Sequence, residues 1–245
     1  MGSEENRSSA IKTSQFYDTR WTTRTKEPTG DERKRLRAVQ LALEKIIRRS
    51  NLRILDLGCG RGWMAPFLCR WGIVIGIDFS EAGIEFAKRN YGNCGEFVVA
   101  DPTDPRLGLS VGQSYDLVVC SEVIEHVPDA AGLLQDIRQF LRVGGWCILT
   151  TPNGRLWEVW AERSKGNFQP IENWLTPGEL RTLFQSTGFK VLRHYGVAGT
   201  RCGSPTLLQR GRVARLFERL HLDILYGRLI LPVALYQVVV ARRRP

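Results

Sequence analysis

A glycine loop with an acidic residue just ahead of it is the first feature of this sequence that could do chemistry. The segment reads Ile54-Leu-Asp-Leu-Gly-Cys-Gly-Arg-Gly62, with Asp56 two residues before the first glycine. Glycines such as Gly58 and Gly60 let the backbone turn sharply and come close to a ligand that a Cβ atom would exclude. A Gly-x-Gly loop alone also suits the pyrophosphate of a dinucleotide. Asp56 is placed to orient the loop or to attract an ammonium group.

Two more acids, Asp78 and Asp101, close the next two apolar runs of the chain. If these runs are neighbouring parallel strands, both carboxylates lie at the crevice where the strands end. Asp78 can accept hydrogen bonds from two ribose hydroxyls there, and Asp101 from the exocyclic amine of an adenine. Each acid alone could be a turn residue or a helix cap. Together with the glycine loop, the three acidic residues Asp56, Asp78 and Asp101 would repel a pyrophosphate, so they favour a nucleoside that carries positive charge.

A second group, Glu122, Glu125 and His126, has the i, i+3, i+4 spacing that one helical turn would place on one face. Imidazoles titrate near neutrality, so His126 is a candidate general base, with the two carboxylates as catalytic partners. The three side chains could instead bind a divalent cation such as magnesium, which would acidify a substrate hydroxyl. They could also simply brace the loop by hydrogen bonds.

Aromatic residues are concentrated in two places that could receive a substrate. Tyr17 and Trp21 form an N-terminal group that could fold over a bound ligand or merely anchor the first helix. After Asn153 the regular pattern breaks, and the following segment contains Trp157 and Trp174. Insertions at this point of a sheet lie over the crevice, where aromatic rings can stack on a planar substrate. Burial of a small accessory helix by the same tryptophans is the plainer alternative.

The elements that must position these residues alternate between apolar strands and amphipathic helices. We expect strands over 53–57, 73–78, 96–100, 117–121, 146–151, 189–194 and 234–241, and helices over 31–49, 64–71, 80–90, 129–141 and 176–188, with Asp31 as the cap of the first helix. This alternation predicts an α/β fold of Rossmann-like type, with a mostly parallel sheet covered by helices on both faces.

A single domain accommodates all of these elements. We expect residues 1–50 to form an N-terminal lid and helix, and residues 51–245 to form the ligand-binding domain, with insertions at about 155–175 and 200–233.

The quoted motifs resemble those of class I S-adenosylmethionine-dependent methyltransferases. Leu55-Asp-Leu-Gly-Cys-Gly-Arg-Gly62 is similar to their first motif, and Gly76-Ile-Asp-Phe-Ser80 and Ala100-Asp101 are similar to their second and third. The resemblance covers about residues 51–197 and implies a seven-stranded sheet with an antiparallel last strand. It also implies S-adenosylmethionine as cofactor, with contacts from Gly58, Gly60, Asp78, Phe79, Asp101, Pro102 and Ser121.

The motif Glu122-Val-Ile-Glu-His126 resembles two branches of this superfamily. In ubiquinone-biosynthesis O-methyltransferases it marks the substrate side and a divalent-cation site. In enzymes that 2′-O-methylate the 3′ ends of small RNAs it supplies three of four metal ligands, the fourth being a downstream histidine. This chain has no histidine between Pro152 and Phe189, where Glu172 is the only replacement available.

Composition limits the remaining choices. No apolar run approaches the roughly 18 residues that span a bilayer, and the first residues lack a secretory pattern, so we expect a cytoplasmic protein, monomeric or homodimeric. The formal net charge is +10, and nine arginines against two acids follow residue 200. This segment could contact nucleic acid or anionic lipid, the latter through an amphipathic stretch near residue 216, or could be a solvated face.

We therefore expect methyl transfer to the hydroxyl of a small molecule of aromatic, quinone, sugar or lipid type. The alternatives are an RNA 2′-O-methyltransferase, a non-catalytic cofactor-binding module and a nicotinamide-dependent oxidoreductase.

Overall fold

The computed structural model describes residues 16–19, 21–22, 28–101, 114–157, 171–197 and 223–245. Within this part of the chain, one seven-stranded sheet has the order β3-β2-β1-β4-β5-β7-β6. Its strands are β1 (Leu52–Leu57), β2 (Gly72–Asp78), β3 (Glu96–Val99), β4 (Tyr115–Ser121), β5 (Leu141–Pro152), β6 (Phe189–Val197) and β7 (Tyr236–Arg243). Only β7 runs antiparallel to its neighbours. The predicted Rossmann-like sheet with an antiparallel last strand is confirmed.

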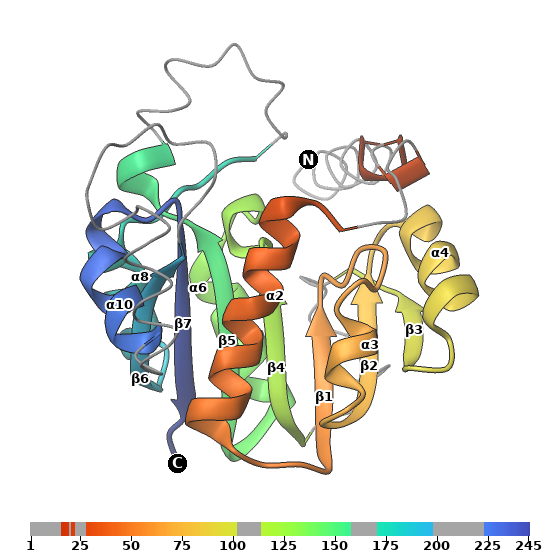
Figure 1. Ribbon diagram of the computed structural model, residues 1–245, viewed down its shortest axis with the longest axis horizontal. Coiled ribbons are helices and arrows are strands. Elements are labelled where there is room, and N and C mark those ends of the chain that lie inside the picture. Colours follow the sequence, from red (N-terminus) through yellow and green to blue (C-terminus); the bar gives the residue numbers. More distant parts are fainter. Residues whose placement is uncertain (1–15, 20, 23–27, 102–113, 158–170, 198–222) are drawn as a thin grey trace, which may run out of the picture.

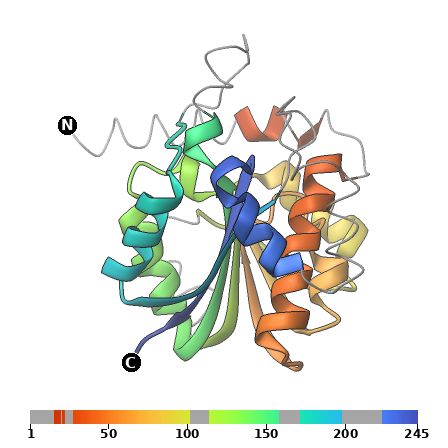
Figure 2. The ribbon, with the colours of Figure 1, turned by 60° about the vertical axis from the view of Figure 1, so that its left-hand side comes forward.

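Helices cover both faces of this sheet (Figures 1 and 2). They are α2 (Gly30–Ala42), which continues as a π-helical turn (Leu43–Ile47), α3 (Ala65–Leu68), α4 (Glu81–Tyr91), α6 (Ala130–Phe140), α8 (Pro177–Ser186) and α10 (Asp223–Ile230). Side chains of α6 and α8 fill the core on one face, and those of α2 fill the core on the other.

The alternation of residues along each strand separates these two cores. In β1, Leu55 and Leu57 pack toward α6 and α8, whereas Leu52 and Ile54 pack toward α2. Successive side chains of a strand point to opposite faces of its sheet, so apolar strands of this kind must be covered twice. The sheet is therefore fixed from both sides, and its strand ends form a stable edge for a site.

The starts of α4, α6 and α8 were predicted correctly, whereas that of α2 was not. Ser80, Asp129 and Thr176 each accept a hydrogen bond from the first turn of the helix that follows. The expectation that Asp31 caps α2 is wrong, because Thr29 accepts from the Glu32 amide in a reciprocal capping box. The Thr-x-x-Glu spacing that signals this box is present in the sequence.

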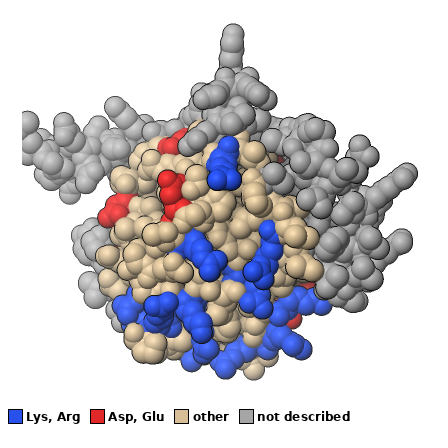
Figure 3. Space-filling view, turned by 90° about the vertical axis from the view of Figure 1, so that its left-hand side faces the viewer, with Lys and Arg blue, Asp and Glu red and all other residues tan. Residues whose placement is uncertain are grey.

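Basic side chains gather at the end of the sheet away from the parallel strands' carboxyl ends (Figure 3). Lys190 and Arg242, which are directly opposite each other on β6 and β7, are exposed there together with Arg244. The other arginines of the basic C-terminal segment, except Arg228 on α10 and Arg243 on β7, lie outside the described residues, as does most of the amphipathic stretch near residue 216. Among the described residues, no helix has the length and apolar character needed to cross a bilayer.

Candidate active site

The glycine loop between β1 and α3 adopts the conformation that only glycine enters without strain. Gly58, Gly60 and Gly62 have φ values of +75°, +54° and +69°. A Cβ atom on Gly58 would lie 2.3 Å from Cγ2 of Val123, and one on Gly60 would lie 2.9 Å from Cζ2 of Trp21. The loop therefore packs tightly against the segment that follows β4 and against the N-terminal aromatic group.

Asp78, at the end of β2, holds this loop in place. Its two carboxylate oxygens accept from the amides of Gly60 and Ser80 at 2.8 and 2.9 Å. Burial raises its pKa to about 6; these two amides lower it, and the charge of Asp18 adds to the rise. A carboxylate has acceptor capacity beyond two amides, so the ribose contact predicted for Asp78 remains available to it.

Asp56, within β1, is the most unusual carboxyl group of the loop. It is 3% exposed, and its Oδ2 is buried without a hydrogen-bond partner. Burial, followed by the charge of Asp78, raises its pKa to about 7. Within the described residues neither Asp56 nor Asp78 forms an ion pair, so no cation of this part of the chain balances the two carboxyl groups when they ionise.

The remaining predicted cofactor residues differ in where they lie. Phe79 directly follows Asp78, and Ser121 is the last residue of β4. Both therefore lie at the same edge of the sheet. Asp101 is exposed just beyond β3, and Pro102 lies outside the described residues.

Tyr17 and Trp21 cover the loop from the N-terminal side. The Tyr17 ring meets Phe79 edge-on at 5.1 Å and lies 6.3 Å from the His126 ring, while Trp21 lies against Gly60. Tyr17 thus stands between a predicted cofactor residue and a predicted catalytic residue.

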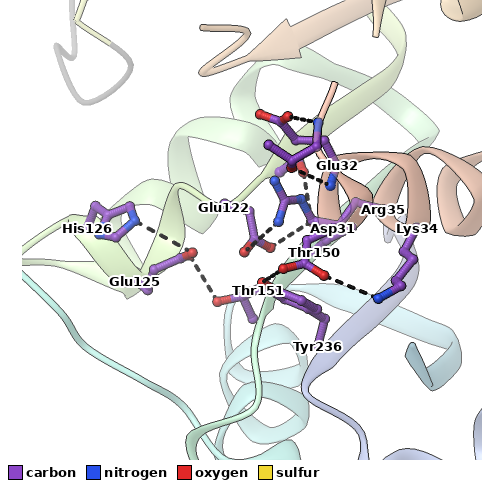
Figure 4. Close-up of polar contacts among 12 residues, drawn as sticks. Asp31, Glu32, Lys34, Arg35, Glu122, Glu125, His126, Thr150, Thr151 and Tyr236 are labelled. Carbon is purple, nitrogen blue, oxygen red and sulfur yellow. Dashed lines mark hydrogen bonds and ion pairs between the residues drawn. The ribbon is translucent and has the colours of Figure 1, made fainter. Parts of the chain in front are cut away.

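The reaction side begins at Glu122, the first residue after β4. Glu122 has φ +58°, a left-handed value that costs strain in a residue with a side chain. The predicted single helical turn is therefore wrong, because only Ile124–His126 forms a 3₁₀ turn and Glu122 lies outside it. The three polar side chains still meet at one end of the sheet (Figure 4).

Glu125 and His126 form a buried pair. Oε2 of Glu125 accepts from the Thr151 hydroxyl at 2.9 Å, and its Oε1 lies 3.7 Å from Nε2 of His126. Nδ1 of His126 lies 2.9 Å from the Ile171 carbonyl oxygen. A carbonyl can only accept, so this bond puts the proton of a neutral imidazole on Nδ1 and leaves Nε2 as the basic nitrogen. Burial raises the pKa of Glu125 to about 8.

Glu122 belongs to a second network that sequence analysis missed. Its Oε2 lies 3.5 Å from the Arg35 guanidinium of α2, and its Oε1 accepts from the Thr150 hydroxyl at 3.1 Å. Arg35 also lies over the Tyr236 ring, 5.3 Å from the centroid. Burial raises the pKa of Glu122 to about 7, although the positive charge of Arg35 opposes the rise.

These contacts separate the residues that were predicted to share a metal ion. Glu122 is directed to Arg35 and Thr150, whereas Glu125 is directed to Thr151 and His126. In the part of the chain that the structure describes, no group of three or more His, Cys, Asp or Glu side chains is arranged to hold a metal ion. The substitute ligand Glu172 instead accepts from the indole of Trp174 at 2.7 Å.

The predicted substrate residues beyond β5 have two different roles. Trp157 packs against Trp174 and Tyr236 at centroid distances of 6.3 and 5.8 Å, which forms an aromatic cluster beside Arg35. Asn153 is fully buried, and its amide donates to the carbonyls of Leu231 and Ala234. Asn153 therefore ties the end of β5 to the chain entering β7, although its Oδ1 has no partner. The rest of the insertion, residues 158–170, lies outside the described residues.

Comparison with known proteins agrees with this geometry. The sequence profile of the family described as "Methyltransferase domain" matches residues 29–194. The chain is 35% identical over 106 residues to a ubiquinone biosynthesis O-methyltransferase of Leptothrix cholodnii, which covers 42% of this chain and 45% of the relative. It is 27% identical over 158 residues to the enzyme of that name from Bartonella quintana, covering 60% and 64%. The chain thus spans about half to two thirds of the length of these curated relatives.

Solved structures share the fold at low sequence identity. The magnesium protoporphyrin IX methyltransferase of Synechocystis, solved with bound S-adenosylhomocysteine, superposes with a TM-score of 0.61 at 16% identity. The superposition covers 94% of this chain and 94% of that chain.

Proposed function

Because this chain belongs to the methyltransferase domain family, as a class I S-adenosylmethionine-dependent methyltransferase, we propose that it methylates a hydroxyl group of a small molecule. The observation that carries the methyl-donor part of the proposal is the pair of buried carboxyl groups at the glycine loop that have no cation among the described residues. Asp56 has a buried oxygen without a partner, and Asp78 is satisfied by backbone amides alone. A cofactor with an ammonium and a sulfonium group is the ligand that such a site favours.

The residues of the loop fit this cofactor. Gly58 and Gly60 let the backbone approach the ligand, Asp78 remains able to accept from ribose hydroxyls, and Asp56 attracts the ammonium group. Phe79, Asp101 and Ser121, at the ends of β2, β3 and β4, complete the proposed set together with Pro102, which lies outside the described residues. When bound, S-adenosylmethionine supplies an electrophilic methyl group on a sulfonium.

The reaction side supplies a base and a place for the acceptor. An acceptor oxygen displaces sulfur at the methyl carbon, and we assign its proton to Nε2 of His126, the nitrogen left basic by the Ile171 contact. Glu125, 3.7 Å away, stabilises the imidazolium that results. Glu122 and Arg35 hold the loop that carries these groups.

The aromatic residues around His126 and Arg35 suit a small aromatic or amphipathic acceptor. Tyr17 on one side and the cluster of Trp157, Trp174 and Tyr236 on the other offer ring faces and edges. The likeness to ubiquinone biosynthesis O-methyltransferases supports O-methylation. RNA is less favoured, because the chain has no histidine between Pro152 and Phe189 to complete the four-ligand metal site of the small-RNA enzymes.

The test is a transfer assay with methyl-labelled cofactor and a panel of phenols, catechols, quinols, sugars and short RNA. We expect label in the organic-soluble or small-molecule fraction, and loss of that label in His126→Ala. Transfer into RNA alone would favour the 2′-O-methyltransferase alternative. Failure to bind S-adenosylhomocysteine by calorimetry would overturn the methyl-donor assignment itself.

A further inference from the structure

A carboxylate outside the predicted site docks the N-terminal segment (residues 16–19, 21 and 22) onto the start of α4, beside the glycine loop. Oδ1 of Asp18 accepts from the Ser80 hydroxyl at 2.5 Å and from the Ala82 amide at 3.3 Å. Both donors belong to the first turn of α4, where helix amides and the helix dipole favour negative charge. The Ser80 hydroxyl also accepts from the Gly83 amide, so this turn binds Asp18 through a side chain that is itself fixed.

The residues on either side of Asp18 are the aromatic residues that cover the site. Tyr17 lies edge-on to Phe79 and beside His126, and Trp21 lies within van der Waals distance of where a Cβ of Gly60 or Gly83 would be. The hydrogen bonds of Asp18 therefore tie these two rings to the start of α4, beside the glycine loop.

We propose that Asp18 is a positioning residue of the cofactor site, which holds Tyr17 and Trp21 over the glycine loop and thereby slows the release of bound cofactor. The inference rests on the proposed function, because it takes the loop to be the cofactor site. Asp18 acts through the two rings, so its loss should weaken S-adenosylmethionine and S-adenosylhomocysteine alike. A direct charge contact would instead favour the sulfonium form over the neutral thioether.

The first experiment measures the binding of S-adenosylmethionine and S-adenosylhomocysteine by calorimetry and their dissociation by stopped-flow tryptophan fluorescence. For Asp18→Ala we expect affinity for both ligands to fall about tenfold, mostly through faster dissociation, with little change in melting temperature. Asp18→Asn, which keeps an acceptor oxygen, should lose less. The matched control is Asp129→Asn, because Asp129 likewise accepts from the first turn of a helix, α6, away from the loop. This control should leave the affinity unchanged.

The second experiment repeats Asp18→Ala in a Tyr17→Ala/Trp21→Ala background. If Asp18 acts by positioning the rings, its removal there costs no further affinity. A persistent tenfold loss in that background, or an unchanged affinity of Asp18→Ala in the native background, would overturn the proposal. Absence of S-adenosylhomocysteine binding to the unaltered protein would instead remove the proposed function on which the inference rests.

Discussion

The two sides of the crevice handle buried carboxyl groups in opposite ways. On the cofactor side, Asp78 has two backbone amides and Oδ2 of Asp56 has no hydrogen-bond partner, and within the described residues neither has a cation. On the reaction side, Glu122 and Glu125 have Arg35, threonine hydroxyls and His126. The cofactor side leaves its carboxyl groups without a cation, which a cationic ligand could supply, whereas the reaction side places Arg35 and His126 beside its own. This contrast is why we assign ligand binding to Asp56 and Asp78 and a supporting or catalytic role to Glu122 and Glu125.

The largest expected effect concerns cofactor binding on the cofactor side. Asp78→Asn should weaken S-adenosylmethionine affinity about 100-fold, because it removes charge and replaces an acceptor by a donor facing backbone amides. Calorimetric titration measures this. The matched control is Asp116→Asn, because Asp116 also accepts from a backbone amide, that of Arg53, but at the other end of the sheet. Equal loss in both variants would show a general effect on folding rather than a binding role for Asp78.

On the reaction side we expect an effect of nearly the same size, but on the turnover rate instead of cofactor affinity. Glu125→Gln should lower kcat about 100-fold with little change in cofactor affinity, because Glu125 stabilises a proton transferred to His126. The wild-type rate should also rise with pH as Glu125, whose pKa is raised to about 8, becomes ionised. Steady-state kinetics across pH 6–9, with an acceptor found in the transfer assay, gives both readouts.

The control for this variant is Glu179→Gln, which alters another carboxylate that accepts from a threonine hydroxyl, Thr176, but on α8. It should leave kcat unchanged. If Glu125→Gln lowers only the melting temperature and not kcat, Glu125 braces the loop and has no catalytic part.

The cofactor side could be predicted from sequence because its residues lie close together and obey local rules. Gly58 and Gly60 need positive φ, and Asp78 ends an apolar strand that must join the sheet beside β1. The mostly parallel sheet could likewise be predicted, because the alternation of apolar strands and amphipathic helices is a local pattern of the sequence. The cap of α2 was misjudged although the spacing of Thr29 and Glu32 signals it in the sequence.

The reaction side could not be predicted as well because its contacts join distant segments. Arg35 comes from α2, Tyr236 from β7 and Thr150 from β5, and no local spacing relates them to Glu122. The left-handed backbone of Glu122 broke the helical spacing on which the shared metal site depended. Polar residues that become neighbours only when the strands and helices assemble leave no periodic pattern in the sequence.

Removing one carboxylate from each side should have a smaller effect on the free energy of unfolding, with opposite signs for the reaction side and the cofactor side. Glu122→Gln should lower the free energy of unfolding by about 2 kcal/mol, because it leaves Arg35 buried without its partner charge. Asp56→Asn should raise it by about 1 kcal/mol at pH 8, because a buried unpaired charge is removed. Urea denaturation of the cofactor-free protein measures both. At pH 5 the gain from Asp56→Asn should vanish, and a gain that persists there would show that charge is not its cause.

The smallest expected effect is the pH dependence of cofactor affinity. The pKa values of Asp56 and Asp78 are raised to about 7 and about 6 in the free protein, from an ordinary value near 4. Between pH 4 and 7 the folded protein therefore binds more protons than the unfolded chain, so cofactor-free stability should fall as pH rises through this window. A cationic ligand favours the ionised carboxylates, so its affinity should instead rise, by about threefold from pH 6 to 8.

The titration of the cofactor's own ammonium is common to all variants, so the comparison of wild type with Asp56→Asn isolates the contribution of the protein. The variant should show the shallower rise in affinity, measured as the difference in melting temperature with and without S-adenosylmethionine. Glu122→Gln, on the reaction side, should leave the slope as in wild type, because Arg35 rather than the ligand balances that carboxylate. If both variants flatten the slope equally, the two sides titrate as one unit and the contrast between them does not hold.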